Sequence, residues 1–376
     1  MQPSNTSGAL PGMTSTVAII GTRGYPSYYG GFETAVRKLS PHLVDDGWDV
    51  TVYGREGSTK PNDPTRDQRV RAVTTRGVES KSLSTLSYGL TASLNAFRTK
   101  PDVALVMNVA NGFFLPLLKA RGIKTLVNVD GIEWDRAKWG RLAKTIFRLG
   151  ARFTARFADD LVFDSREIER RWNEEFRRDG VFIPYGGDEP EELPLEPGLR
   201  HRGYVLVVAR FVPENTIPEF LDAAEHIAQR FPVVIVGSSG YGGPLDEQAR
   251  DLSRKISNVH ALGHISDDRR LLSLWQHAGV YFHGHSVGGT NPTLVQAMAT
   301  ATPIVARDTV YNREVLGEGA HLCAPTPEAI TEAVCQLMED ESAQREASQS
   351  ALDRSRSTYT WPIVNGAYAE ALRRLL

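Results

Sequence analysis

Two glycine-rich segments carry residue types that bind phosphate. The first runs over residues 21–24 and 30–33, and the second spans residues 283–292. Each follows an apolar, strand-like run and precedes a helix-like one. Glycine lets backbone N–H groups approach an anion closely, and the N-terminus of the following helix adds a partial positive charge. Together the two segments predict one phosphate-bearing ligand held between two domains.

The first segment departs from the dinucleotide-binding fingerprint. No G-x-G-x-x-G follows its strand, so a nicotinamide or flavin site is disfavoured. Arg23, which lies among glycines, predicts a carboxylate or phosphate partner, and the alternative is a surface arginine on a loop. Gly30 and Gly31 stand just ahead of the helix that carries Glu33. They could cradle a phosphate or only cap that helix.

A pair of carboxylates follows a strand-like run that ends near Asn128. Asp130 and Glu133 are three residues apart, with Trp134 next. Ligands of open α/β sheets bind at the carboxyl ends of the strands. Asp130 is the nearer to the strand, and it could bond a sugar hydroxyl or accept the proton of an attacking hydroxyl. The alternative is an aspartate that caps the next helix.

Residues 136–156 contain seven basic side chains and no acidic one, interleaved with aromatic and aliphatic residues. A basic amphipathic helix of this kind can lie on an anionic bilayer, where each cation contributes about 1 kcal/mol. The alternative is a solvated helix that packs its aromatic stripe into its own domain. Membrane contact would make a lipid the expected acceptor.

Charged and glycine residues also end the strands of the second half. Arg210 follows one strand and can clamp a diphosphate, and Gly237 ends the next with a backbone concavity suited to anions. His264 could line a base pocket or be a polar loop residue. His283 and His285 lack a third metal ligand nearby, so we expect hydrogen bonds to sugar or phosphate.

The glycine pair before the Pro292 helix is the most specific element of the chain. Gly288, Gly289, Thr290 and Asn291 offer backbone N–H groups where that helix begins. Proline in the first turn of a helix is well tolerated because its missing N–H is not needed there.

Composition describes an ordinary globular chain of two domains. It has 376 residues, 41% hydrophobic and 23% charged, with a formal net charge of −2, which argues against a nucleic-acid partner. Cys323 and Cys335 have neither disulfide nor zinc spacing, which favours a reducing cytoplasm. Residues 1–16 read as a disordered lead-in rather than a signal peptide. No run reaches the roughly 18 apolar residues of a membrane span, so membrane association would be peripheral.

Alternating strand-like and helix-like runs predict the α/β class, with two doubly wound Rossmann-like domains facing each other across a cleft. The first domain is expected over residues 17–187. A proline- and acid-rich linker follows at 188–198, and the second domain covers 199–357.

These motifs together resemble the retaining glycosyltransferases of family 4, which have the GT-B fold. The closest likeness is to a bacterial rhamnosyltransferase-like subgroup, marked by Gly-Thr-Arg-Gly-x-Pro at residue 21, Tyr-Gly-Gly-Phe-Glu-Thr at residue 29 and Gly-His-Ser-x-Gly-Gly-Thr-Asn-Pro at residue 284. The likeness covers nearly the whole chain. It implies that residues 358–376 form a helix that crosses back to the N-terminal domain.

The resemblance implies transfer of a sugar from a nucleotide-diphosphate donor, held by the C-terminal domain, to a lipid-linked or glycan acceptor on the N-terminal domain. It implies no metal or other cofactor, and no Asp-x-Asp stands at a strand end. We expect catalytic roles for Asp130, Arg210 and His285. Donor binding is then expected of Gly30, Gly31, Arg210, Asn215, Gly237, His264, His283, Gly288, Gly289, Thr290, Asn291 and Gln296, and acceptor binding of Arg23, Glu33, Glu133 and Trp134.

Three positions depart from the wider family. Asn215 stands where the family has a lysine, and Gly288 and Gln296 stand where it has glutamates. Since a family carboxylate at position 296 would accept both ribose hydroxyls, a neutral amide suits a deoxyribose and hence dTDP-L-rhamnose. Alternatives are another nucleotide-sugar donor, a GT-B sugar-nucleotide epimerase, or a sugar-nucleotide-binding protein of reduced activity.

Overall fold

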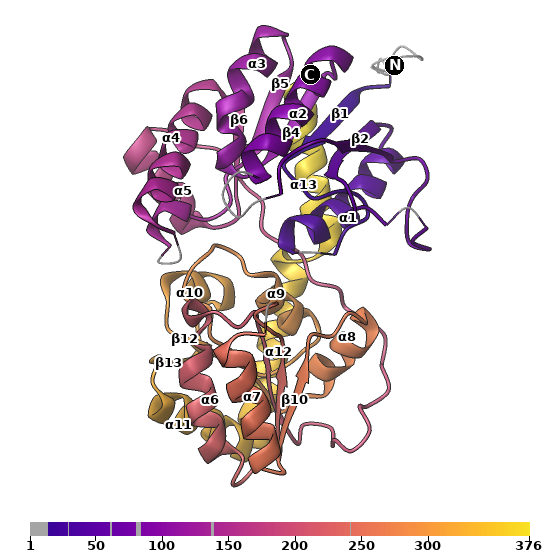
Figure 1. Cartoon of the computed structure of the whole chain (residues 1–376). Coiled ribbons are helices and arrows are strands. Elements are labelled where there is room, and N and C mark those ends of the chain that lie inside the picture. Colours follow the sequence, from indigo (N-terminus) through magenta and orange to yellow (C-terminus); the bar gives the residue numbers. More distant parts are fainter. Residues whose placement is uncertain (1–13, 29, 61, 80–83, 137–138, 241) are drawn as a thin grey trace, which may run out of the picture. The chain divides into compact units, whose positions relative to one another are not determined.

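The computed structural model describes residues 14–28, 30–60, 62–79, 84–136, 139–240 and 242–376. The chain forms two compact units, and Figure 1 labels most of their helices and strands. The first unit contains Met1–Asn128, Gly150–Asp160 and Tyr368–Leu376, and the second contains Val129–Leu149 and Leu161–Ala367. Residues 129–149 and 161–187, which sequence analysis places in the N-terminal domain, therefore group by contacts with the C-terminal half.

Within the described residues, the N-terminal sheet has seven strands in the order β3-β2-β1-β4-β5-β6-β7. Val17 of β1 pairs in parallel with Val50 of β2 and Val103 of β4. Every residue of β4 is buried, as expected for a short apolar strand with both faces covered. The strands are β1 (Thr16–Ile20), β2 (Asp49–Arg55), β3 (Arg71–Thr75), β4 (Val103–Met107), β5 (Lys124–Asn128), β6 (Asp160–Phe163) and β7 (Val181–Phe182).

The predicted lead-in of residues 1–16 extends too far along the chain. Residues 1–13 lie outside the described residues, and Thr16 is already the first residue of β1. Its side-chain hydroxyl and its backbone N–H both donate to Asp102 Oδ2 at 2.8 Å. These bonds fix the beginning of the strand.

Helices follow the strands as the alternating pattern predicts. In α1, Ala35, Val36, Leu39 and Leu43 recur at helical spacing and are all buried, which is the signature of an amphipathic helix. The helices before residue 180 are α1 (Gly31–Asp45), α2 (Ser84–Thr99), η1 (Val109–Phe114), α3 (Leu115–Ala120), η2 (Glu133–Asp135), α4 (Arg141–Phe157) and α5 (Arg166–Phe176).

In the part of the C-terminal half that the structure describes, the sheet has six strands in the order β10-β9-β8-β11-β12-β13, all paired in parallel. Phe220 and Phe282 stack at 5.1 Å in its core. The strands are β8 (Val205–Val208), β9 (Val233–Val236), β10 (Val259–Gly263), β11 (Val280–His283), β12 (Ile304–Arg307) and β13 (His321–Cys323). The helices are η3 (Pro213–Asn215), α6 (Ile217–Ile227), α7 (Pro244–Lys255), α8 (Asp268–His277), α9 (Pro292–Ala299), α10 (Val310–Leu316), α11 (Pro327–Glu339), α12 (Glu341–Thr358) and α13 (Trp361–Arg373).

The final helix joins the two units, as predicted. Helix α13 begins in the second unit, and from Tyr368 onward it belongs to the first. Asn128 Nδ2 donates to the Tyr368 hydroxyl at 2.7 Å, and Arg373 forms an ion pair with Asp46. None of the helices in the described part of the chain is long and apolar enough to cross a membrane.

Residues 188–198 have neither helix nor strand but are well anchored. The backbone N–H of Leu193 donates to Gln276 Oε1 at 2.8 Å, and Ser273 Oγ donates to the carbonyl of Pro194 at 2.6 Å. Both partners lie on α8. The segment therefore runs along this helix within the second unit.

Gly237 tests how closely the second sheet is packed. Its φ of 137° disfavours other residues, and a Cβ there would lie 1.8 Å from the Ala209 carbonyl oxygen. We expect Gly237→Ala to lower the free energy of unfolding by at least about 2 kcal/mol, measured by urea denaturation. Gly366→Ala is the control, because no atom beyond its chain neighbours and its own helix backbone lies within 4 Å of its Cβ position and alanine favours a helix by about 1 kcal/mol. Equal stability of the two variants would contradict the packing described.

Candidate functional site

Arg136 lies at the centre of a buried charge cluster in the second unit. Its side chain is 13% exposed, with Nε 2.8 Å from Glu133 Oε1 and Nη1 3.9 Å from Glu214 Oε1. Burial lowers the pKa of Arg136, but the carboxylates of Glu133, Asp130, Glu214 and Asp164 outweigh that effect and raise it. Sequence analysis put Arg136 in the basic surface segment, whereas the structure turns it inward.

The glycine pair of the second motif lies against this cluster. A Cβ on Gly288 would have only Arg136 Nη2 within 4 Å, at 3.8 Å, whereas one on Gly289 would lie 2.1 Å from Asp164 Oδ1. The backbone N–H of Thr290 donates to the Asp164 carbonyl at 3.2 Å, and the Thr290 hydroxyl donates to the same oxygen. Any larger residue at position 289 would therefore require the Asp164 side chain to move.

Asp164 is a site residue that sequence analysis missed. It is 5% exposed, and its Oδ1 has no hydrogen-bond partner. Burial, with the nearby charges of Asp130 and Glu314, raises the pKa of Asp164 to about 8 even though Arg136 opposes the shift. The side chain is therefore mostly neutral at pH 7 and can donate a hydrogen bond. The available signal was its place directly after β6, which matches that of Asp130 after β5.

Asp130, predicted as the catalytic base, belongs to the same cluster. It lies two residues after the end of β5 and is half-buried. Its φ of 62° is in the left-handed region, which aspartate tolerates better than most residues. The charge of Asp130 acts on the pKa values of both Arg136 and Asp164. Asp130 is therefore electrostatically coupled to the rest of the site.

The two histidines of the second motif are stacked, with ring centroids 4.5 Å apart. His283 is fully buried, with Nδ1 3.1 Å from the Tyr281 hydroxyl. The structure thus places this predicted donor contact in the core. Burial and the charges of Arg210 and Arg136 lower the pKa of His285 to about 3. His285 is therefore a neutral imidazole at pH 7, able to donate or accept a hydrogen bond.

Arg210 is exposed just beyond the end of β8. Asn215 was predicted to bind the donor, but it is 4% exposed and its Nδ2 donates to the Arg210 carbonyl at 3.0 Å. Asn215 thus shapes the turn that presents Arg210. The Glu214 carbonyl accepts hydrogen bonds from Ser286 N at 3.0 Å and Oγ at 2.7 Å, which ties this turn to the second glycine motif.

The side-chain amide of Gln296 forms two hydrogen bonds with the backbone of Asp188. Its Nε2 donates to the Asp188 carbonyl at 2.7 Å, and its Oε1 accepts from the Asp188 N–H at 3.0 Å. An amide satisfies both backbone groups, whereas a carboxylate could only accept. This clamp explains the glutamine without a deoxyribose, so the inference from Gln296 to a dTDP donor loses its basis.

Three further predicted donor residues have local structural partners or lie on the surface. Gly237 N–H donates to the Gly263 carbonyl at 2.8 Å, so this amide is not available for a phosphate. His264 is exposed in the loop after β10. The Asn291 side chain accepts from Thr293 N at 3.1 Å and thereby caps α9.

The first glycine turn already binds a carboxylate of its own chain. Glu33 is 6% exposed, and its Oε1 accepts from Arg23 N–H at 3.0 Å and from Thr22 Oγ1 at 3.3 Å. Gly30 caps α1, and Gly31 is its first residue. Glu33 thus holds this turn in shape, a role different from the acceptor binding predicted for it.

Glu133 and Trp134, also predicted to bind the acceptor, make contacts within the second unit. Glu133 is 4% exposed, and its Oε2 accepts from Trp139 Nε1 at 2.7 Å. Trp134 packs against Trp172 and Phe176, at centroid distances of 6.4 and 5.9 Å. The structure gives both side chains packing or pairing roles.

Helix α4 has features of both interpretations of the basic segment, a membrane-binding surface and a helix that packs into its own domain. Leu142 is 76% exposed, and Arg141 and Arg152 are also exposed. Phe153, however, packs on Phe113 at 5.3 Å. Lys138 of this segment and Tyr29 of the first motif lie outside the described residues. Phe153 thus contacts a neighbouring ring while remaining 37% exposed, and the helix keeps a basic and apolar surface.

Among the described residues, no group of three or more histidine, cysteine, aspartate or glutamate side chains could hold a metal ion. Cys323 and Cys335 are free and buried. Burial and the charge of Asp308 raise the pKa of Cys323 to about 11. This thiol is therefore not an activated nucleophile.

Comparisons with known proteins cover both halves of the chain. Residues 30–186 match the family described as glycosyl transferase 4-like domain, and residues 197–354 match glycosyl transferases group 1. A phosphatidyl-myo-inositol mannosyltransferase from Mycolicibacterium smegmatis is 32% identical over 212 residues, 53% of each chain. The chain thus spans about half the length of the curated relatives it matches.

Solved structures with this fold include sucrose-phosphate synthase from Thermosynechococcus elongatus, with a TM-score of 0.79, 18% identity and coverage of 96% of this chain and 99% of that one. Anabaena HepE in complex with UDP-glucose has a TM-score of 0.73, 14% identity and coverage of 96% and 99%. At these identities the likeness shows the fold alone, which confirms two parallel-sheet Rossmann-like domains.

Asp164 gives the site a measurable pH dependence. Its pKa is raised in the folded state, so the stability linked to its protonation is complete below the unfolded pKa near 4 and is lost as the pH rises toward 8. We expect the free energy of unfolding of the wild type, relative to Asp164→Asn, to fall by up to about 1.4 kcal/mol per pH unit over this window.

Urea denaturation between pH 5 and pH 9 measures this difference. Asp222→Asn is the matched control for loss of an exposed carboxylate. A difference between wild type and Asp164→Asn that stays constant over the range would show that Asp164 is charged in the folded protein.

Proposed function

Since the chain belongs to the GT-B glycosyltransferases, with a 4-like domain followed by a group 1 domain, we propose that it is a retaining hexosyltransferase that uses a nucleotide-diphosphate sugar. The observation that supports this most strongly is the second glycine turn, where Gly288 lies beside Arg136 and the turn is tied to the loop that presents Arg210.

In this proposal the donor diphosphate lies against the backbone amides near Gly288, with Arg210 as its exposed cation. As the bond from the anomeric carbon to the diphosphate breaks, negative charge builds on the departing nucleoside diphosphate, and Arg210 and Arg136 stabilise it. Fixed dipoles and guanidinium groups would do this without a metal. Neutral His285 and protonated Asp164 would donate hydrogen bonds rather than charge.

Asp130 is the proposed base. It would accept the proton of the acceptor hydroxyl as that oxygen bonds to the anomeric carbon. Asp130 lies two residues beyond the end of β5, close enough for its charge to act on Arg136, and at this end of the sheet it can meet the acceptor hydroxyl. Retention of the anomeric configuration, which the family resemblance implies, requires the acceptor oxygen to bond to the anomeric carbon on the same face that the diphosphate leaves.

The finer donor assignment, L-rhamnose from dTDP-L-rhamnose for cell-surface glycan synthesis, rests on the three sequence signatures of the rhamnosyltransferase-like subgroup. The M. smegmatis relative is named a mannosyltransferase, and the Anabaena protein was solved with UDP-glucose. These names leave GDP- and UDP-sugars as alternatives that the same experiment separates.

A thermal-shift panel of dTDP-, UDP-, GDP- and ADP-sugars on wild type and Gln296→Glu tests the donor. A ligand that binds at 100 times its Kd stabilises the folded state by about 2.7 kcal/mol, and we expect the largest shift with dTDP-L-rhamnose. Gln296→Glu should lower stability by about 1–3 kcal/mol through loss of the Asp188 clamp, with the same donor ranking as wild type.

If Gln296→Glu instead shifts the donor ranking toward UDP-sugars, residue 296 contacts the ribose of the donor. Product analysis with the preferred donor completes the test. Transfer or hydrolysis supports an enzyme, interconversion of sugars indicates the epimerase, and binding with no turnover indicates a protein of reduced activity.

For the acceptor we propose a lipid-linked or polysaccharide chain at the cytoplasmic face of the membrane, with peripheral attachment through α4. Leu142 and Arg152 are exposed on this helix, together with Leu149, which is 38% exposed. Apolar side chains can enter the headgroup region while arginines meet anionic lipids.

Reversing one charge on α4 tests the membrane proposal. Arg152→Glu changes the local charge by two, so affinity for phosphatidylglycerol vesicles should fall about thirtyfold, at about 1 kcal/mol per charge. Co-sedimentation measures this loss, with phosphatidylcholine vesicles as the uncharged comparison. Lys119→Glu on α3 is the control, because Lys119 is also exposed in the first unit. Equal losses in the two variants would leave α4 without a specific membrane role.

A further inference from the structure

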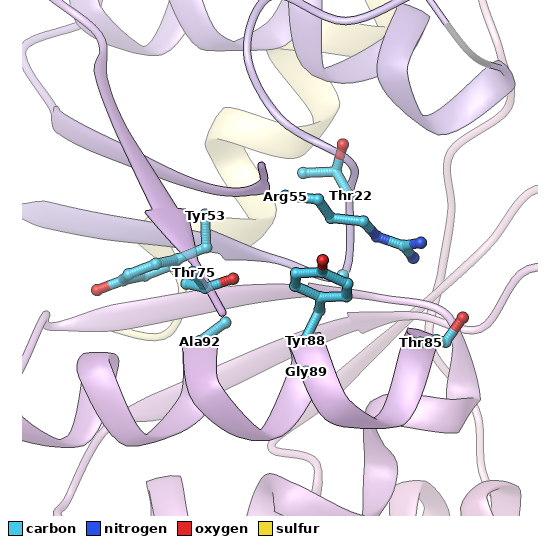
Figure 2. A pocket seen from close by; sticks show the side chains of 9 residues that line it. Thr22, Tyr53, Arg55, Thr75, Thr85, Tyr88, Gly89 and Ala92 are labelled. Atoms are coloured by element: carbon cyan, nitrogen blue, oxygen red, sulfur yellow. The ribbon is translucent and has the colours of Figure 1, made fainter. Parts of the chain in front are cut away.

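The first unit contains a pocket that the proposed donor site does not use. Figure 2 shows its lining side chains, which come from the carboxyl ends of β1, β2 and β3 and from one face of α2. Its enclosed part is small, about 10 Å³ or room for one water molecule, and the volume reaches about 250 Å³ only when the space open to solvent at the mouth is counted. The lining residues are Gly21, Thr22, Tyr53, Arg55, Thr75, Thr85, Tyr88, Gly89 and Ala92.

Arg55, the last residue of β2, extends into this pocket with its charge poorly compensated. The residue is 8% exposed, and neither Nε nor Nη1 has a hydrogen-bond partner. The nearest ion-pair partner is Glu79, whose carboxylate is 3.9 Å from Nη1 on a side chain that is 61% exposed. The guanidinium lies 5.1 Å from the centroid of the Tyr88 ring, over which it extends in Figure 2.

The charges around Arg55 do not offset its burial. Burial and the neighbouring Arg23 lower the pKa of Arg55, and Glu79 and Glu33 raise it by less. Glu33 is already engaged by the Arg23 N–H and the Thr22 hydroxyl. A buried cation without a full set of partners is costly, so an incoming anion would be favoured here.

Two glycines keep the walls of the pocket in place. A Cβ on Gly21 would lie 2.3 Å from the Met107 carbonyl oxygen, and one on Gly89 would lie 2.0 Å from Asn111 Oδ1. The backbone therefore packs closely behind the pocket. The polar groups in front of it are the guanidinium and the hydroxyl groups of Tyr88 and Thr85 (Figure 2).

We propose that the pocket at Arg55 binds an oxyanion of the acceptor, a phosphate or a carboxylate, through the Arg55 guanidinium. Guanidinium groups bind such anions with paired, charge-assisted hydrogen bonds. The assignment to the acceptor rests on the function proposed above, which leaves the donor to the second unit. Binding of the anion itself depends only on the first unit.

Anion binding to the full-length protein without donor tests the proposal. The probes are inorganic phosphate, acetate, glycerol phosphate and vesicles of phosphatidic acid, each titrated by thermal shift. The proteins carry Arg210→Gln, which removes the exposed cation of the donor site. Adding Arg55→Gln should weaken phosphate binding at least about tenfold. Adding Arg98→Gln, an exposed arginine of the same unit, should leave it unchanged.

The melting temperature of each variant shows whether a loss of phosphate binding is caused by unfolding. Arg55→Gln removes an uncompensated buried cation, so its melting temperature without ligand should equal or exceed that of its parent. Arg55→Lys keeps the charge but loses the planar fork, and it should bind phosphate with intermediate affinity. Phosphate binding that is the same with arginine, lysine or glutamine at position 55 would overturn the proposal.

The probes also separate the sources of the anion. Stronger binding of phosphatidic acid vesicles than of glycerol phosphate, lost in Arg55→Gln, identifies a lipid headgroup, whereas equal binding identifies a soluble phosphate ester. Selective binding of acetate identifies a carboxylate. If the wild type binds phosphate through Arg55 but neither hydrolyses nor transfers any nucleotide sugar, the proposed function fails while the anion pocket stands.

Discussion

The burial of Arg136 among carboxylates is the constraint on which the candidate site depends. A guanidinium that is 13% exposed is stable only if opposite charges surround it, and Glu133 and Glu214 supply two of them at 2.8 and 3.9 Å. The cluster in turn fixes the second glycine turn, because Asp164 occupies the space beside Gly289 where a side chain would lie. Glycine at this position thus follows from packing as well as from any ligand.

The same cluster shifts the pKa values of two further groups, Asp164 and His285, in opposite directions. Asp164 is held mostly neutral by burial and by Asp130, while His285 is held neutral by burial and two arginines. Strongly shifted pKa values of this kind are typical of functional sites. A polyanionic diphosphate would meet guanidinium groups, hydrogen-bond donors and few competing charges at this turn.

Much of the fold could be predicted from the sequence, because short apolar runs such as β4 alternate with amphipathic helices such as α1. The site was harder, since its contacts join residues far apart in the chain. Arg136 shares its basic pattern with α4 but precedes the first residue of that helix, Arg141, so its direction could not be read from periodicity. Asp164 belongs to no recognisable motif. The partner of Gln296 is the backbone of Asp188, and a backbone partner cannot be predicted from residue types.

Hydrogen–deuterium exchange with and without the preferred nucleotide sugar is the most direct test of the central claim, that the second glycine turn and the Arg210 loop bind the donor diphosphate. The account predicts that the donor slows exchange at amides within residues 284–291 and 210–216, and that this protection is lost in Arg210→Gln. Protection confined to the first unit, or none at the 284–291 turn with a donor that binds, would contradict it.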